Sequence, residues 1–107
     1  MRKGDIVLVS FPFTDFSGNK VRPALVLSVS TLDVIVAFIS TQLHRKEQVD
    51  IELDPSSDNG LKRVSIIKVA KLVTIEKKLV LGLLGKLDDK KLSELDKGLK
   101  KIFQLSY

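Results

Sequence analysis

Two hydrophobic periodicities divide this chain, and the switch between them constrains the fold more than any other feature. Up to residue 87 the apolar residues come in short runs, rich in β-branched side chains and separated by turn formers, which is typical of strands. The expected strands cover residues 5–11, 23–29, 33–39, 49–53, 65–69, 71–74 and 79–87. From Asp88 onward the period lengthens to that of a helix. The sequence therefore predicts a mainly β fold that ends in one α-helix.

The predicted strands favour a small barrel. Residues 23–29 and 33–39 are almost continuously apolar, which indicates burial on both faces, as where a sheet curls over itself or is covered by a helix. Gly82 and Gly85 interrupt the last apolar run, and glycine within a strand often marks a bulge or a sharp bend. Because the 107 residues have a uniform composition, we expect one domain over residues 1–107.

The expected helix is amphipathic and has suitable ends. Asp88 and Asp89 favour its N-terminus and the lysines at 100 and 101 its C-terminus, whereas Gly98 weakens it. Its apolar face is expected to consist of Leu92, Leu95, Leu99, Ile102 and Phe103. The lysines on the opposite side are interpreted as a solvated face.

Composition excludes several kinds of chemistry. The chain has no Cys and one His, so disulfides, thiolate metal sites and cysteine nucleophiles are excluded and a His-based zinc site lacks ligands. No apolar run approaches the ~20 residues of a membrane span, and no signal peptide is recognisable. We therefore expect a soluble, cytoplasmic protein without a metal or other cofactor. The net charge of +5 favours an anionic partner without identifying it.

Arg22 is the basic residue set most deeply among apolar sequence, and two roles are open to it. It is either the partner of Asp5 or Asp15 in a structural ion pair or a clamp that holds a phosphate through two parallel bonds. Residues 40–42, Ser-Thr-Gln, end an apolar run and are either ordinary turn residues or part of a site.

Other polar residues suggest no site of their own. His44 stands in a charged loop without a carboxylate to orient it, so we expect it on the surface. Asp50, Glu52 and Asp54 alternate along one strand and are expected on its solvated face, with no metal site.

Several short motifs together resemble one known family. They are Gly-Asp at 4–5, Phe-Pro-Phe-Thr-Asp at 11–15, Arg-Pro-Ala-Leu-Val-Leu-Ser at 22–28, Ser-Thr-Gln at 40–42 and the apolar segments at 65–67 and 71–75. Their order and spacing are similar to those of the PemK/MazF toxin endoribonucleases, over essentially the whole chain. The resemblance implies a small SH3-like barrel with a C-terminal helix, which forms a homodimer and is inhibited by a cognate antitoxin.

The resemblance also implies a reaction. PemK/MazF toxins of type II toxin–antitoxin systems cut single-stranded RNA at specific sequences, without a metal, through the 2′-hydroxyl of the substrate. The family's catalytic arginine falls on Arg22 and its catalytic threonine on Ser40, which keeps the hydroxyl but lacks the β-branch that stiffens χ1. The expected RNA-binding residues are Thr41, Gln42, Lys20, Arg45, Phe16 and Lys62, with Phe13 and Arg63 as further candidates.

An alternative is a non-catalytic binding module on the same barrel, such as a gyrase poison, because of the Ser40 departure. In either case the segment of an antitoxin that covers the site is expected to be acidic and amphipathic.

Overall fold

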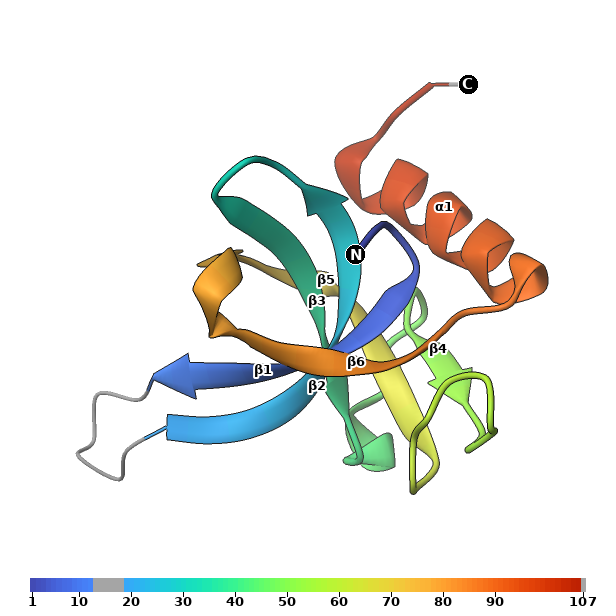
Figure 1. Ribbon diagram of the computed structural model, residues 1–107. Coiled ribbons are helices and arrows are strands. Elements are labelled where there is room, and N and C mark those ends of the chain that lie inside the picture. Colours follow the sequence, from blue (N-terminus) through green and yellow to red (C-terminus); the bar gives the residue numbers. More distant parts are fainter. Residues whose placement is uncertain (13–18, 107) are drawn as a thin grey trace.

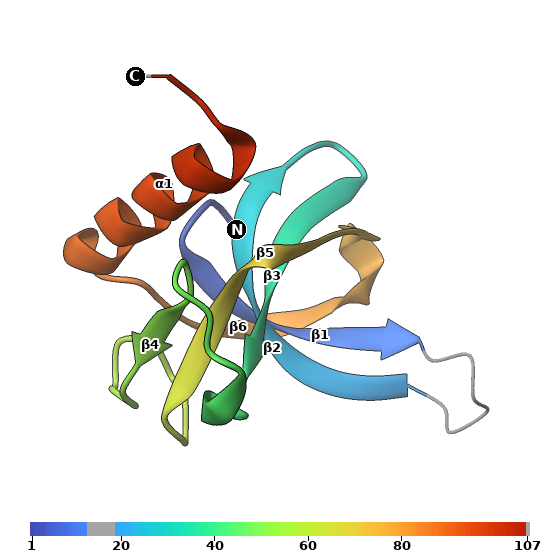
Figure 2. The ribbon, with the colours of Figure 1, turned by 180° about the vertical axis from the view of Figure 1, so that it is seen from behind.

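The computed structural model describes residues 1–12 and 19–106, in which six strands form one antiparallel sheet (Figure 1). The strands are β1 (Asp5–Pro12), β2 (Asn19–Val29), β3 (Asp33–Ser40), β4 (Ile51–Leu53), β5 (Ser65–Glu76) and β6 (Val80–Lys86). Two 3-10 turns, η1 (Leu43–Arg45) and η2 (Lys77–Leu79), follow β3 and β5, and helix α1 (Asp89–Phe103) ends the fold. The spatial order is β4-β5-β3-β2-β1-β6. Views from both sides show a curled sheet with α1 against one end (Figure 2), which confirms the predicted small β-barrel with a C-terminal helix.

The sheet is buried on both faces. Consecutive residues of one strand contribute to two different clusters, as Ile6 and Val7 do in β1 and Ala24 and Leu25 do in β2. One cluster lies under α1 and includes Leu95 of the helix, and the other lies on the opposite face of the sheet. The two-sided burial explains why the central strands are apolar at nearly every position.

Helix α1 begins and ends as its sequence predicts. The Asp88 carboxylate caps the N-terminus by accepting a hydrogen bond from Lys91 N at 2.8 Å. Gly98 is buried, and a Cβ there would stand 3.3 Å from Val69 Cγ1, so the glycine permits close packing on β5. Phe103 is 57% exposed, contrary to its expected place on the apolar face, because it lies at the last position of the helix.

The first hairpin is longer than expected. Strand β1 extends to Pro12 and β2 starts at Asn19, and these two residues are partners in the ladder. A proline removes only one donor, so at the end of a strand it does not stop pairing of the residues around it.

Strand β5 is one bent strand rather than two pieces. Ala37 pairs with Leu72 and its neighbour Phe38 with Lys68, so residues 69–71 have no partners in β3. Such an insertion bends a strand and redirects its side chains. Pairing of β1 with β6 also shifts register at two places, near Gly82 and Gly85, as the glycines predicted.

Candidate functional site

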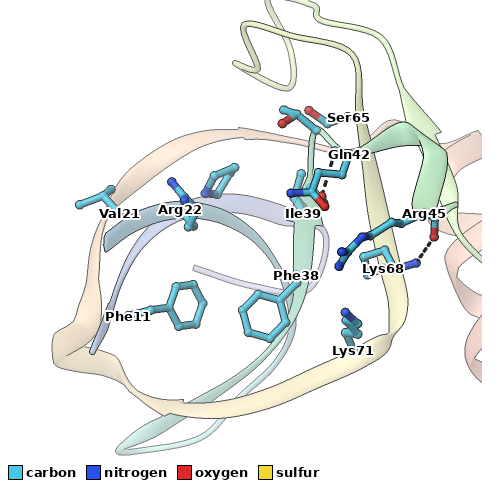
Figure 3. Close-up of a pocket in the computed structure, with 13 residues that line it drawn as sticks. Phe11, Val21, Arg22, Phe38, Ile39, Gln42, Arg45, Ser65, Lys68 and Lys71 are labelled. Atoms are coloured by element: carbon cyan, nitrogen blue, oxygen red, sulfur yellow. Dashed lines mark hydrogen bonds between the residues drawn. The ribbon is translucent and has the colours of Figure 1, made fainter. Parts of the chain in front are cut away.

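One groove of about 650 Å³ collects five of the ten residues that the sequence predicts to be catalytic or RNA-binding (Figure 3). It lies where β2 and the end of β3 approach η1 and the bulge of β5. The predicted site residues in its lining are Arg22, Ser40, Thr41, Gln42 and Arg45.

The register of the sheet brings Arg22 and Ser40 to the same level. In the antiparallel ladder of β2 and β3, Ala24 pairs with Phe38. Arg22 comes two residues before Ala24, and Ser40 comes two residues after Phe38. Because side chains alternate with a period of two, Arg22 shares the face of Ala24 and Ser40 shares the face of Phe38. The two residues expected to be catalytic thus line one groove although 18 positions separate them in the sequence.

Arg22 is exposed, which corrects the expectation of a deeply set guanidinium. Ala24, Leu25 and Val26, which follow it, are buried in the two clusters, whereas Arg22 lies nearer the start of β2, beside Val21, which is 48% exposed. Among the described residues it forms no ion pair, and Asp5 instead accepts a hydrogen bond from Arg2 N at 2.9 Å. A pair with Asp5, one of the alternatives that the sequence left open, is therefore absent, and Asp15 lies outside the described residues.

Ser40 is half-buried, and its hydroxyl is held by the backbone. Its Oγ accepts a hydrogen bond from Gln42 N at 3.0 Å. In a threonine, the β-branch restricts χ1 and so helps to orient the hydroxyl. A serine lacks this branch, and here the hydrogen bond from Gln42 N orients its hydroxyl instead. The hydroxyl proton and a second lone pair remain for a ligand.

Two phenyl rings form an apolar part of the groove. The ring centroids of Phe11 and Phe38 are 5.0 Å apart, with 29° between the ring planes. Phe11 is only 8% exposed, whereas Phe38 is half-buried. Strand β2 lies between β1 and β3 in the sheet order, so it is the curl of the sheet that lets these rings meet. Aromatic faces of this kind are surfaces on which nucleic-acid bases stack.

The charged side chains that line the groove are cationic. They are Arg22, Arg45, Lys68 and Lys71, and no acidic residue of the described segments lines it. Lys71 belongs to the bulge of β5, which explains how a strand residue reaches this place. In Figure 3, Arg22 lies above Phe11, and Arg45 and Lys71 lie to the right of Phe38. The groove therefore favours an extended anion.

Lys68 is the buried member of this group and forms an ion pair that the sequence analysis missed. Its Nζ lies 2.5 Å from Asp50 Oδ2 and 3.3 Å from Glu47 Oε1. The hydrogen bond to Asp50 raises the pKa of Lys68 above its ordinary value, although desolvation acts in the opposite direction. Asp50 is 8% exposed, so its expected place on a solvated face is wrong, whereas Glu52 and Asp54 are exposed as predicted. The error arose because Asp50 precedes β4 and turns towards β5.

Other predicted RNA-binding residues lie elsewhere. Lys20 is opposite Phe11 in the β1–β2 ladder and does not line the groove. Lys62 and Arg63 are exposed in the connection between β4 and β5, also outside it. Phe13 and Phe16 lie outside the described residues.

The residues that the sequence analysis missed left only weak signals. Lys68 is a single charge inside the apolar run 66–69, a pattern that indicates a buried charge with a partner. That signal does not name Asp50 as the partner. Nothing in the local sequence distinguishes Lys71 from an ordinary surface lysine. Nor does it distinguish Phe11 and Phe38 from ordinary core residues.

His44 lies exposed in η1, as predicted. Within residues 1–12 and 19–106, no three His, Asp or Glu side chains gather in a way that suits a metal ion. Of the helices in this part of the chain, none has the length and apolar character needed to cross a membrane.

Comparison with known proteins places the chain in a family. The family model described as "PemK-like, MazF-like toxin of type II toxin-antitoxin system" matches residues 2–103. No curated protein sequence gave a match.

Solved structures share the fold at low sequence identity. An endoribonuclease from a mycobacterial species, solved with its cognate antitoxin, has a TM-score of 0.76 and 17% identity over 100% of this chain and 98% of that chain. The Mycobacterium tuberculosis toxin MazF-mt6 has a TM-score of 0.75 and 22% identity over 94% of this chain and 99% of that chain. MazF in a MazE–MazF structure from Deinococcus radiodurans has a TM-score of 0.75 and 18% identity, over 99% and 97%. The fold and the family model agree with the motifs at residues 4–5, 22–28 and 40–42. Because the family model matches nearly the whole chain, the chain belongs to the PemK-like, MazF-like toxins of type II toxin–antitoxin systems.

Proposed function

We propose that this toxin is an endoribonuclease that cleaves single-stranded RNA at specific sequences, using the 2′-hydroxyl of the RNA as nucleophile and no metal ion. The observation that carries the proposal is that Arg22 and Ser40 line one groove, each two residues beyond the last pair of the β2–β3 ladder, Ala24 and Phe38. An arginine and a hydroxyl at this place fit a reaction in which charge builds up on a phosphate group.

The proposed reaction is an in-line displacement at phosphorus. The 2′-hydroxyl gives its proton through Ser40 Oγ to water, and its oxygen bonds to the adjacent phosphorus. The bond to the 5′-oxygen breaks, and water supplies that oxygen with a proton. The products are a 2′,3′-cyclic phosphate and a 5′-hydroxyl. Arg22 stabilises the negative charge on the phosphorane, because a guanidinium stays protonated and bonds two oxygens at once. Ser40 accepts a hydrogen bond from the 2′-hydroxyl and aligns it for attack.

The remainder of the groove suits a single strand. Bases splayed from such a strand stack on aromatic faces, and Phe38 offers a half-buried ring beside the cations. Arg45 and Lys71, which lie to the right of Phe38 in Figure 3, bind further phosphates of the strand. Thr41 and Gln42 present a hydroxyl and an amide, which are suited to the edges of bases.

Cleavage of a long single-stranded RNA in the presence of EDTA tests this proposal. We expect discrete cuts, with new 5′ ends that a polynucleotide kinase labels without prior phosphatase treatment. Arg22→Ala and Ser40→Ala should each lower the cleavage rate by about 100-fold or more. Lys3→Ala serves as a matched control, because Lys3 pairs with Asp96 of α1 outside the groove.

Two results would contradict the proposal. One is the absence of defined cuts in any long RNA, which would favour a binding module without catalysis. The other is cleavage that persists at the wild-type rate in both the Arg22 and the Ser40 variants, because another site would then carry the reaction.

We further propose that an antitoxin with an acidic segment covers the groove, and that the toxin acts as a homodimer. The cationic lining supports the first proposal, as does the antitoxin in the mycobacterial structure named above. Leu81 and Leu83 on the edge strand β6, which are 57% and 68% exposed, support the second. Sedimentation velocity tests the dimer, and competition between an acidic peptide and RNA tests the antitoxin site.

A further inference from the structure

Residues 41–48, which we call the groove loop, contribute to the groove but are themselves exposed at every position. The 3-10 turn η1 within this loop buries no residue. Burial of apolar side chains therefore does not hold the groove loop in place, unlike the strands on either side of it.

Hydrogen bonds inside the groove loop shape it without attaching it to the sheet. Arg45 N donates to Gln42 O at 3.0 Å, and Lys46 N donates to Leu43 O at 3.1 Å. Glu47 N donates to Asp50 Oδ2 at 2.8 Å, which ties the end of the loop to a buried carboxylate.

Apart from the bond from Gln42 N to Ser40 Oγ at its start, the groove loop is attached to the sheet through Lys68 on β5. The ammonium group donates to Arg45 O at 2.7 Å, to Asp50 Oδ2 at 2.5 Å and to Glu47 Oε1 at 3.3 Å. These three acceptors match the three N–H donors of a lysine. Asp50 Oδ1 also accepts a hydrogen bond from Val69 N at 3.2 Å, so the carboxylate is bound to β5 twice.

One of these bonds bears directly on the groove. Arg45 O, the acceptor for Lys68, belongs to the residue whose guanidinium lines the groove (Figure 3). A bond from a buried ammonium to a backbone carbonyl is charge-assisted and short, and it fixes the backbone from which the Arg45 side chain extends. The Lys68 cation is already neutralised by Asp50, so it is poorly suited to bind a phosphate itself.

From these contacts we infer that Lys68 is a positioning residue that holds the groove loop, and with it Arg45, in the conformation that binds RNA. The inference rests on the proposed function and assigns Lys68 a role through Arg45 rather than through contact with the reacting atoms. Its loss should weaken substrate binding and leave the chemical step at Arg22 and Ser40 intact.

The test needs a variant that does not leave a buried charge unpaired, since Lys68→Met alone strands Asp50 and can unfold the protein. We therefore combine Lys68→Met with Asp50→Asn, which removes both charges and keeps a carbonyl acceptor near Val69 N. Because the asparagine no longer accepts from Glu47 N, the double variant is compared with Asp50→Asn alone, which keeps the bond from Lys68 to Arg45 O. Lys3→Met is the matched control, because Lys3 Nζ lies 2.5 Å from Asp96 Oδ1 in a half-exposed pair away from the groove.

Two measurements follow on the full chain. Hydrogen exchange should become at least about tenfold faster for the amides of residues 43–47 in the double variant, while the amides of β2 and β3 stay protected. With an RNA that the wild type cuts, KM should rise about tenfold and kcat should change less than about twofold. Lys3→Met should change neither quantity.

Unchanged exchange in the groove loop would overturn the inference, whatever happens to cleavage. Faster exchange with an unchanged KM, or a fall in kcat alone, would overturn it as well. If the wild type cuts no RNA, the proposed function fails, and the exchange measurement separately reports whether Lys68 holds the loop.

Discussion

The cations of the groove predict how strongly salt should weaken RNA binding. Four cationic side chains line it, and Lys68 is neutralised by Asp50, which leaves Arg22, Arg45 and Lys71 to replace counterions on phosphates. Each phosphate that a protein neutralises on a single strand lowers the slope of log K against log salt by about 0.7. Three contacts give a slope of about −2, so a tenfold rise in salt should weaken binding by about 100-fold.

Removing one of these charges should flatten the slope. Arg45→Gln and Lys71→Gln should each give a slope of about −1.4, or about a 25-fold loss over the same range of salt. Lys3→Met changes the net charge by the same amount outside the groove and should leave the slope near −2. The comparison therefore separates contacts in the groove from the general effect of a basic protein.

Fluorescence anisotropy of a labelled, fully 2′-O-methylated RNA strand measures this slope, because such a strand has no 2′-hydroxyl nucleophile. Titrations at four salt concentrations suffice to define it for each variant. A slope near zero in the wild type would refute the assignment of the groove to RNA. An equal slope in the wild type and in both groove variants would refute it too, as would a flattening in Lys3→Met as large as theirs.

Three further predictions concern single positions. Ser40→Thr should cleave RNA within about tenfold of the wild-type rate because the hydroxyl remains, and a loss as large as that of Ser40→Ala, about 100-fold, would contradict a role for the hydroxyl alone. In urea titrations, Gly85→Ala should lower the free energy of unfolding by about 1–3 kcal/mol, because a Cβ there would lie 2.1 Å from Asp58 O. Gly82→Ala should change this free energy by less than about 0.5 kcal/mol, because no atom lies within 4 Å of a Cβ at that position. The raised pKa of Lys68 means that its contribution to stability is present below the ordinary value of 10.5 and is lost as pH rises through the higher value in the folded protein. Urea unfolding of the wild type and of the variant that combines Lys68→Met with Asp50→Asn should therefore differ by a constant amount from pH 7 to about 10, and the difference should change only above that range. A difference that changed already near pH 8 would contradict this.

Local pattern was sufficient for the main elements of the fold. The period of two up to residue 87 and the helical period from residue 88 correspond to six strands and α1. Asp88 caps the helix as its position predicted. Such features depend on neighbours within a few residues, and those neighbours are visible in the sequence.

The candidate site was only partly visible in the sequence. Arg22 and residues 40–42 stand at the ends of apolar runs within recognisable motifs, so they were found without coordinates. Asp50 was misassigned because alternation predicts which face of a strand a residue occupies and does not predict what covers that face.

Other parts of the site depend on contacts between segments far apart in the chain. Lys68 meets Asp50 from 18 residues away, and Phe11 meets Phe38 across an intervening strand. Lys71 reaches the groove through a bulge that exists only in the pairing of β3 with β5. The sequence by itself determined the strands, the helix and five residues of the candidate site. Only the tertiary structure decided which charges are paired and which face the groove, because register, curl and bulges are properties of the whole sheet and of no single segment.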